Sequence, residues 1–157
     1  MPEIDASTVR QLLVFELRQL THILSSMVEA ALVPAGVTLR HFGVLTRIYA
    51  HPGQNQREIG EMLRIDRTTV VALADDLELA GLLERRRGVD RRSFALYLTR
   101  EGKARIEQLQ RMVADTQATF LSSLDAGEQS VLLSMIGKLL ATGPPSPPAA
   151  ETKDRRS

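Results

Sequence analysis

Arginine is concentrated in one short stretch of this 157-residue chain. Between residues 82 and 100 there are six arginines and two acidic residues, whereas the whole chain carries a formal net charge of only +1. These arginines are Arg85, Arg86, Arg87, Arg91, Arg92 and Arg100. A guanidinium group binds phosphate through paired N–H donors. A compact basic segment in a nearly neutral protein indicates nucleic-acid binding, although a solvated arginine-rich loop would have the same composition.

The residues around the arginines predict a β-hairpin. Leu82–Arg85 and Phe94–Leu98 have the composition of two short strands, and Gly88-Val89-Asp90 between them is typical of a turn. Two helices are predicted just before this hairpin. Asn55 and Glu58 have the spacing of a capping box, and Asp66 is placed to cap the next helix. Two such helices, joined by about three residues, indicate a helix-turn-helix.

The second helix of this pair presents side chains that can read bases. They lie opposite its apolar stripe and are Arg67, Thr68, Thr69, Val71 and Ala72. Arginine can bridge guanine, threonine can donate to a base or a phosphate, and small apolar side chains can pack on a thymine methyl group. The alternative is that Thr68 and Thr69 only occupy the first helical turn. Gln54, Asn55 and Gln56 can donate to a phosphate, but capping explains Asn55 equally well.

Long helical patterns surround this core and predict a mainly α fold of six helices with a two-stranded β wing. We expect an N-terminal dimerisation helix in residues 1–35, a winged helix-turn-helix lobe in 36–99 and C-terminal dimerisation helices in 100–142. The proline-rich composition of residues 143–157 predicts a disordered tail. The first, fifth and sixth helices carry more apolar surface than one small lobe can cover, which favours a homodimer.

Composition argues against several other classes of function. The chain has no cysteine, which excludes disulfides, thiolate metal sites and cysteine-based peroxide sensing. With only three histidines and no catalytic or phosphate-loop motif, we expect no enzyme activity, metal or cofactor. No apolar run approaches the length of a membrane span, and no signal peptide is recognisable, so a cytoplasmic protein is expected.

The wing and the residues after it resemble a known family. Asp90-Arg91-Arg92-Ser93, followed by Leu98-Thr99 and Gly102, is similar to the D-x-R, L-T-x-x-G signature of the MarR family of bacterial regulators. The resemblance implies an intertwined homodimer that binds a pseudo-palindromic operator in double-stranded DNA. It implies a transcriptional regulator in the cytoplasm, and a repressor released by a small ligand is the form we expect.

The resemblance also implies roles for the arginines of the wing. Arg92 matches the arginine that enters the minor groove, where narrow A·T-rich DNA concentrates negative potential. Arg91 is expected to reach the backbone or the same groove, and Asp90 to pair with a wing arginine and shape the loop. Arg86 and Arg87 are expected to face phosphates on alternate sides of the strand, unless one of them faces the protein.

Family members sense small phenolic or lipophilic molecules between their dimerisation helices and the DNA-binding lobe. Arg18, His22 and His41 are the candidates here for lining such a crevice around a small aromatic or anionic effector, with surface or capping roles as the alternative. A winged-helix adaptor that binds protein instead of DNA is the competing function. The polar start of the helix after Asp66 argues against it.

Overall fold

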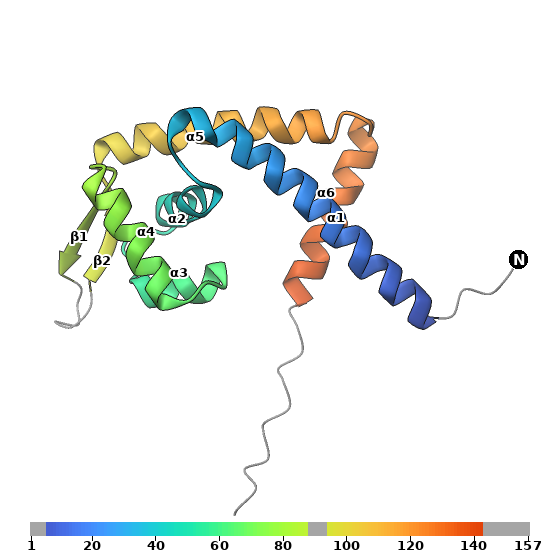
Figure 1. Cartoon of the computed structure of the whole chain (residues 1–157), viewed down its shortest axis with the longest axis horizontal. Helices are drawn as coiled ribbons and strands as arrows, with labels where there is room; N and C mark the ends of the chain where they lie inside the picture. Colours follow the sequence, from blue (N-terminus) through green and yellow to red (C-terminus); the bar gives the residue numbers. More distant parts are fainter. Residues whose placement is uncertain (1–5, 88–93, 143–157) are drawn as a thin grey trace, which may run out of the picture. The chain divides into compact units, whose positions relative to one another are not determined.

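The computed structural model describes residues 6–87 and 94–142. In this part of the chain there are six α-helices, one 3-10 turn and one two-stranded sheet (Figure 1). The elements are α1 (Ala6–Leu32), η1 (Val33–Ala35), α2 (Leu39–Ala50), α3 (Gln56–Leu63), α4 (Arg67–Leu79), β1 (Leu83–Arg87), β2 (Phe94–Leu98), α5 (Arg100–Phe120) and α6 (Ala126–Thr142). This order confirms the predicted fold class of six helices and a β wing.

Local capping sets the beginnings of the lobe helices. The Thr38 side chain accepts from the His41 backbone N–H at 3.2 Å, and the Asn55 side chain accepts from Glu58 N–H at 3.0 Å. In both cases the third helical residue bonds back to the capping residue, which completes a capping box. Gly81 has a φ of +72°, a left-handed conformation that glycine adopts easily. It follows Ala80, the C-cap of α4, and terminates the helical path of the chain.

The wing is an antiparallel hairpin whose two faces differ. Leu83 lies opposite Leu98, Arg85 opposite Leu96, and Arg87 opposite Phe94. Because side chains alternate along a strand, Leu83, Arg85 and Arg87 share one face of β1 while Glu84 and Arg86 share the other. The first strand begins at Leu83 and extends through Arg87, so the predicted strand 82–85 was too early at both ends. Arg86 and Arg87 therefore lie in the strand itself.

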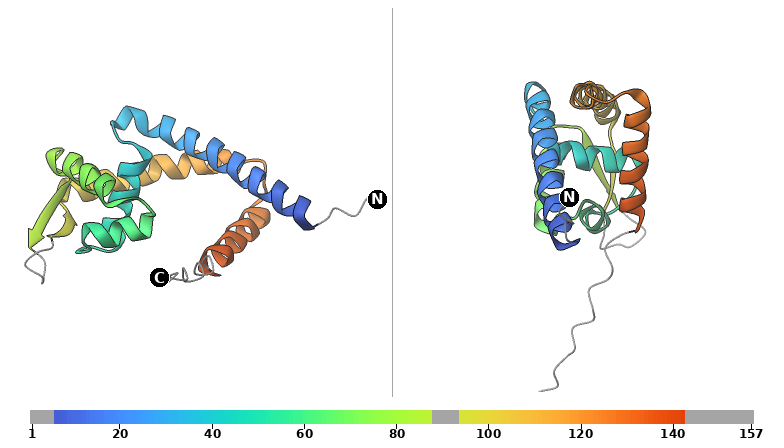
Figure 2. Two further views of the ribbon diagram at one scale, coloured as in Figure 1. Left: turned by 60° about the horizontal axis from the view of Figure 1, so that its bottom comes forward. Right: turned by 90° about the vertical axis from the view of Figure 1, so that its right-hand side faces the viewer.

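Helices α2 to α4, the wing and the adjoining halves of α1 and α5 share one core. Leu45, Ile59 and Leu96 are fully buried in it, together with Leu32 from α1 and Ile106 from α5. Helix α1 packs along α5, and α5 also contacts α2 and β2 (Figures 1 and 2). The chain divides into two compact units, residues 1–120 and residues 121–157.

The start of α5 is fixed tightly to the connection between α4 and β1. The Thr99 hydroxyl donates to Gly81 C=O at 2.7 Å and accepts from Gly102 N–H at 2.9 Å. A Cβ on Gly102 would lie 1.9 Å from the Leu82 carbonyl oxygen, so only glycine fits this contact. Thr99 and Gly102, the T-x-x-G pattern in the sequence, therefore form a packing motif that joins α5 to the lobe.

Two helical regions leave aliphatic side chains exposed. Along α1, seven large apolar residues between Leu12 and Ile23 are 47–59% exposed. In the second unit, a capping box between Asp125 and Glu128 begins α6, on which Val131, Leu133 and Met135 are 54–60% exposed. In the described residues no single helix is long and apolar enough to cross a membrane; one bent pair, Leu12–Ala35 with Leu39–Ala50, passes that test jointly across an 83° bend.

Candidate nucleic-acid interface

Helix α4 exposes the face that the sequence predicts to read bases. Arg67, Thr68 and Ala72 are exposed, whereas Val70, on the opposite side of the helix, is fully buried. Val71 is half-buried, so only part of its side chain is available to a thymine methyl group. The arrangement brings a guanidinium, a hydroxyl and two small apolar groups onto one helical face, which is the chemistry of major-groove recognition.

Thr69 has a local role in the first turn of α4. Its hydroxyl donates to Asp66 Oδ2 at 2.6 Å, and its backbone N–H donates to Asp66 Oδ1 at 2.9 Å. These bonds stabilise the carboxylate, and they lower the pKa of Asp66 below its ordinary value of 3.8. The hydroxyl proton of Thr69 is thus used in the cap. This supports the alternative that Thr69 only occupies the first helical turn and does not contact DNA.

The arginines of β1 have three different environments. Arg87 is exposed at the end of β1, opposite the first residue of β2. Arg86 lies with its guanidinium carbon 4.5 Å from the centre of the Tyr97 ring and forms an ion pair with Glu84. Arg85 is turned inward and forms ion pairs with Asp75 and Glu78 of α4. Of the described wing arginines, Arg87 is the most directly available to a phosphate.

The loop before α3 is attached to the wing, which the sequence did not reveal. Gly53 N–H donates to Leu96 C=O at 2.9 Å, and Leu96 N–H donates to Gln54 C=O at 2.9 Å. Gln54, Asn55 and Gln56 are all half-buried, and Asn55 is occupied by its capping box. Gly53 has a φ of +88°, and a Cβ there would lie 2.8 Å from Tyr97 Oη. Tyr97 and Gly53 therefore join the helix pair to the wing.

Comparison with known proteins agrees with this geometry. A model of the MarR family matches residues 35–93. A structure of the transcriptional repressor CouR, bound to a 23-mer DNA duplex, is 31% identical, with a TM-score of 0.77, and the match covers 88% of this chain and 99% of CouR. The chain belongs to the MarR family. It is a winged-helix transcriptional regulator.

Other structures of MarR-family regulators match over a similar length. Apo MarR from E. coli is 25% identical, with a TM-score of 0.74, and the match covers 82% of this chain and 96% of that one. The Mycobacterium tuberculosis MarR family protein Rv2887, in complex with DNA, is 26% identical, with a TM-score of 0.72 and coverage of 81% and 96%. The likeness therefore extends well beyond the segment matched by the family model.

The MarR-family signature in the wing lies partly outside the described residues. Asp90, Arg91 and Arg92, for which the sequence predicts loop-shaping and groove-binding roles, belong to the segment 88–93. Their roles stay predictions. The described acidic partners of the wing arginines are Asp75, Glu78 and Glu84.

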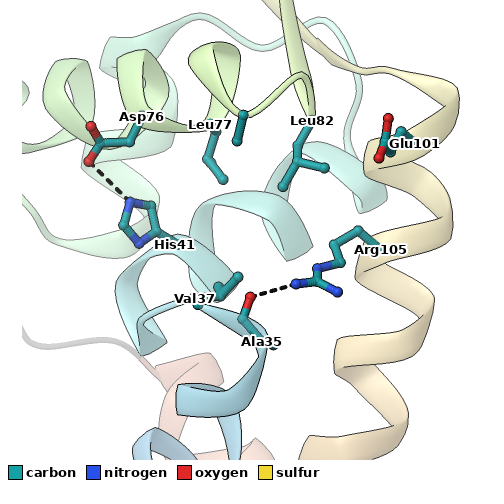
Figure 3. A pocket seen from close by; sticks show the side chains of 10 residues that line it. Ala35, Val37, His41, Asp76, Leu77, Leu82, Glu101 and Arg105 are labelled. Carbon is teal, nitrogen blue, oxygen red and sulfur yellow. Dashed lines mark hydrogen bonds and ion pairs between the residues drawn. The ribbon is translucent and has the colours of Figure 1, made fainter.

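A hollow of about 580 Å³ lies behind α4, and His41 is one of its lining residues (Figure 3). His41 Nε2 is 3.3 Å from Asp76 Oδ2, and its Nδ1 is 2.8 Å from the Thr38 hydroxyl. From the α5 side, Arg105 donates to Ala35 C=O at 2.5 Å. Val37, Leu77 and Leu82 supply apolar lining between these polar groups.

The other two predicted ligand residues do not lie at this hollow. Arg18 and His22 line shallow depressions formed by residues of α1 alone. The structure therefore does not bring the three candidates together, because His41 lies in the first turn of α2 and faces α4, while the other two lie on the exposed stretch of α1. In the described ranges 6–87 and 94–142 no cluster of three or more potential metal ligands occurs.

Proposed function

We propose that this chain is a homodimeric repressor that binds a pseudo-palindromic operator in double-stranded DNA and is released by a small ligand. The observation that carries the DNA-binding part is the exposed face of α4, where Arg67, Thr68 and Ala72 project beside a wing that exposes Arg87. The similar structures of CouR and Rv2887, both solved with DNA, support the same partner.

The side chains divide into base readers and backbone contacts. Arg67 and Thr68 are the base readers with exposed polar groups, and Val71 and Ala72 contact a thymine methyl group. Arg86 and Arg87 contact phosphates from the wing, joined by Arg91 and Arg92, with Arg92 in the minor groove as the family resemblance implies. Gln56, at the first position of α3, is the best placed of its polar neighbours to donate to a phosphate.

The exposed aliphatic face of α1 is covered by a second copy of the chain. Seven large apolar residues about half exposed on one helix would be unfavourable in water, and α6 exposes further residues of the same kind. Residues 1–35 and 100–142 therefore supply dimerisation surface, and residues 36–99 supply the DNA-binding lobe. A two-fold dimer places its half-sites about one helical turn of DNA apart.

The hollow behind α4 is the site that we assign to the effector. Its volume of about 580 Å³ suits a small aromatic molecule, and its apolar floor lies next to the Arg105 guanidinium. Arg105 contacts Ala35 C=O and Gln108 Oε1 and has further N–H donors that can hold an anionic group. A ligand here would press on Leu77 and Asp76, and so on the back of α4.

Selection of duplex DNA from a random pool tests the DNA-binding part. We expect a pseudo-palindrome, whose base preference changes with Arg67→Ala and whose affinity and salt slope fall with Arg92→Ala, the slope by about one unit. Arg40→Gln, which removes one exposed cation from α2, is the matched control and should leave both unchanged. Failure to recover any duplex would contradict the proposal and favour the adaptor function.

Repression and release need a separate experiment. A reporter driven by DNA that contains the selected operator should be silenced by the wild-type protein. Salicylate, a small aromatic carboxylate, is the probe for release in vitro, and Arg105→Gln should bind the operator normally but respond less to salicylate. If Arg105→Gln releases the operator at the same salicylate concentration as the wild-type protein, Arg105 does not bind the effector.

A further inference from the structure

Helix α4 carries two acidic residues close to the face that is proposed to read DNA. Asp75 follows Ala72 by three residues and Thr68 by seven, so it lies on the same helical face as both. Glu78 follows Asp75 by three residues and extends the negative charge along the helix. Free carboxylates at this place would repel the phosphates of a duplex bound against α4.

Arg85 pairs with both of these acids from the wing. Its Nη2 donates to Asp75 Oδ1 at 2.5 Å, and its Nη1 donates to Glu78 Oε2. The Arg85 side chain is only 18% exposed, whereas those of Asp75 and Glu78 are 59% and 40% exposed. One planar guanidinium therefore joins two successive turns of α4 to the middle of β1.

The register of the hairpin explains why this arginine, and not its neighbours, forms the contact. Arg85 lies opposite Leu96 and shares a strand face with Leu83, and both of these leucines are buried. That face looks toward α4, which packs against β1 (Figure 1). Arg86 has the opposite orientation, over Tyr97. A cation at an inward position of the strand needs acidic partners, and α4 supplies them.

We propose that Arg85 is a positioning residue, which holds the wing and α4 in the relative orientation that DNA binding requires and does not itself contact DNA. The pairing turns Asp75 and Glu78 toward the wing and neutralises part of their charge. The proposal rests on the DNA-binding function above, but it makes a claim about the free protein that can be tested separately.

Salt dependence separates a positioning role from a phosphate contact. With the duplex selected by the wild-type full-length protein, Arg85→Gln should weaken binding on the order of tenfold, because the two reading elements are no longer held together. The slope of log K against log salt should stay at the wild-type value, since each lost phosphate contact lowers the slope by about 0.9. A slope lowered by that amount would overturn the proposal.

The paired acids give a second and sharper test. Asp75→Asn/Glu78→Gln removes two negative charges near the DNA, so simple electrostatics predicts tighter DNA binding. If the ion pairs of Arg85 with Asp75 and Glu78 act as a clamp between the wing and α4, the same variant should bind DNA more weakly. The triple variant with Arg85→Gln should bind no more weakly than either parent, because all three residues act as one unit. Binding by Asp75→Asn/Glu78→Gln that equals or exceeds wild type, or additive losses, would overturn the positioning role.

Amide hydrogen exchange tests the same clamp without DNA. Backbone amides of β1 and β2 should exchange several-fold faster in Arg85→Gln and in Asp75→Asn/Glu78→Gln than in wild type, with Arg40→Gln as the control. Unchanged exchange in both variants would overturn the clamp even if the wild-type protein binds DNA as proposed. Faster exchange in a protein that selects no duplex would support the clamp while the proposed function fails.

Discussion

The helix-turn-helix lobe and the exposed stretch of α1 contain the same aliphatic residue types at similar helical spacing, yet only the lobe buries them. Val44, Leu45 and Ile59 in the lobe are fully buried, while Leu13 and Leu17 of α1 are 55% and 49% exposed. The lobe surrounds its apolar residues with three helices and a hairpin from one chain. Hydrophobic periodicity therefore predicts a helix, but not whether the same chain covers its apolar face.

The largest effect is expected in the middle of the lobe. Leu96 is fully buried on β2, and Leu96→Ala should reduce the free energy of unfolding by about 2–5 kcal/mol, since the cavity that it leaves cannot collapse completely. Urea denaturation measures the loss. Leu13→Ala is the control on α1. If it reduces the free energy of unfolding as much as Leu96→Ala does, measured in dilute protein, the two regions do not differ in burial as described.

The junction of the lobe with α5 should be the next most sensitive place. Gly102→Ala puts a Cβ within 1.9 Å of the Leu82 carbonyl oxygen, so the backbone of α5 must move. We expect a loss of about 1–3 kcal/mol in unfolding free energy by urea denaturation. Gly137→Ala, whose Cβ would meet nothing within 4 Å, is the matched control and should not be destabilising. Equal behaviour of the two variants would contradict the tight junction.

Charges placed on α1 should change assembly and not folding of the lobe. Leu13→Glu/Leu17→Glu puts carboxylates on the exposed aliphatic face, and we expect the dimer to dissociate in analytical ultracentrifugation. The melting temperature of this double variant should also be lower than that of wild type, and it should depend less on protein concentration. Gln19→Glu adds a charge at an exposed polar position of the same helix and should stay dimeric. A monomeric wild-type protein would refute the proposed cover for this face.

The smallest effect concerns the cap of α4. Asp66→Ala removes the acceptor for Thr69 and should lower the melting temperature by about 2–4 °C at neutral pH. Because the pKa of Asp66 is lowered in the folded protein, its contribution is present above pH 3.8 and is lost as the pH falls through the folded value. The difference from wild type should therefore shrink in acid. Asp66→Asn can still cap the helix, so its melting temperature should fall less. A difference in melting temperature between Asp66→Ala and wild type that does not change with pH would contradict the role of the carboxylate.

The capped helices and the hairpin were predictable because their signals are local. Asn55 with Glu58, Asp66 and Gly81 act within a few residues of their own positions, so their effects could be read from spacing. The exposure of Arg67, Thr68 and Ala72 on α4 followed from helical periodicity. The ends of β1 were predicted less well than those of β2, because the hydrogen bonds that define β1 come from its partner strand and not from its own residues.

The roles of individual charged residues depended on partners that are distant in the sequence. Arg85, Arg86 and Arg87 are identical in type and adjacent, so composition could not show that the first pairs with α4, the second lies over Tyr97 and the third is exposed. Likewise, spacing on α1 could not show that Arg18 and His22 lie away from the hollow that His41 lines.

The arginine-rich stretch between residues 82 and 100 shows both kinds of signal. Its residues and those before it are enough to predict a positively charged hairpin after a capped helix pair, because capping and turn preferences act over a few residues. Which arginine faces inward to Asp75 and Glu78 is set by the tertiary structure alone. That choice depends on strand register and on the packing of α4 against β1, and neither is encoded in any single segment.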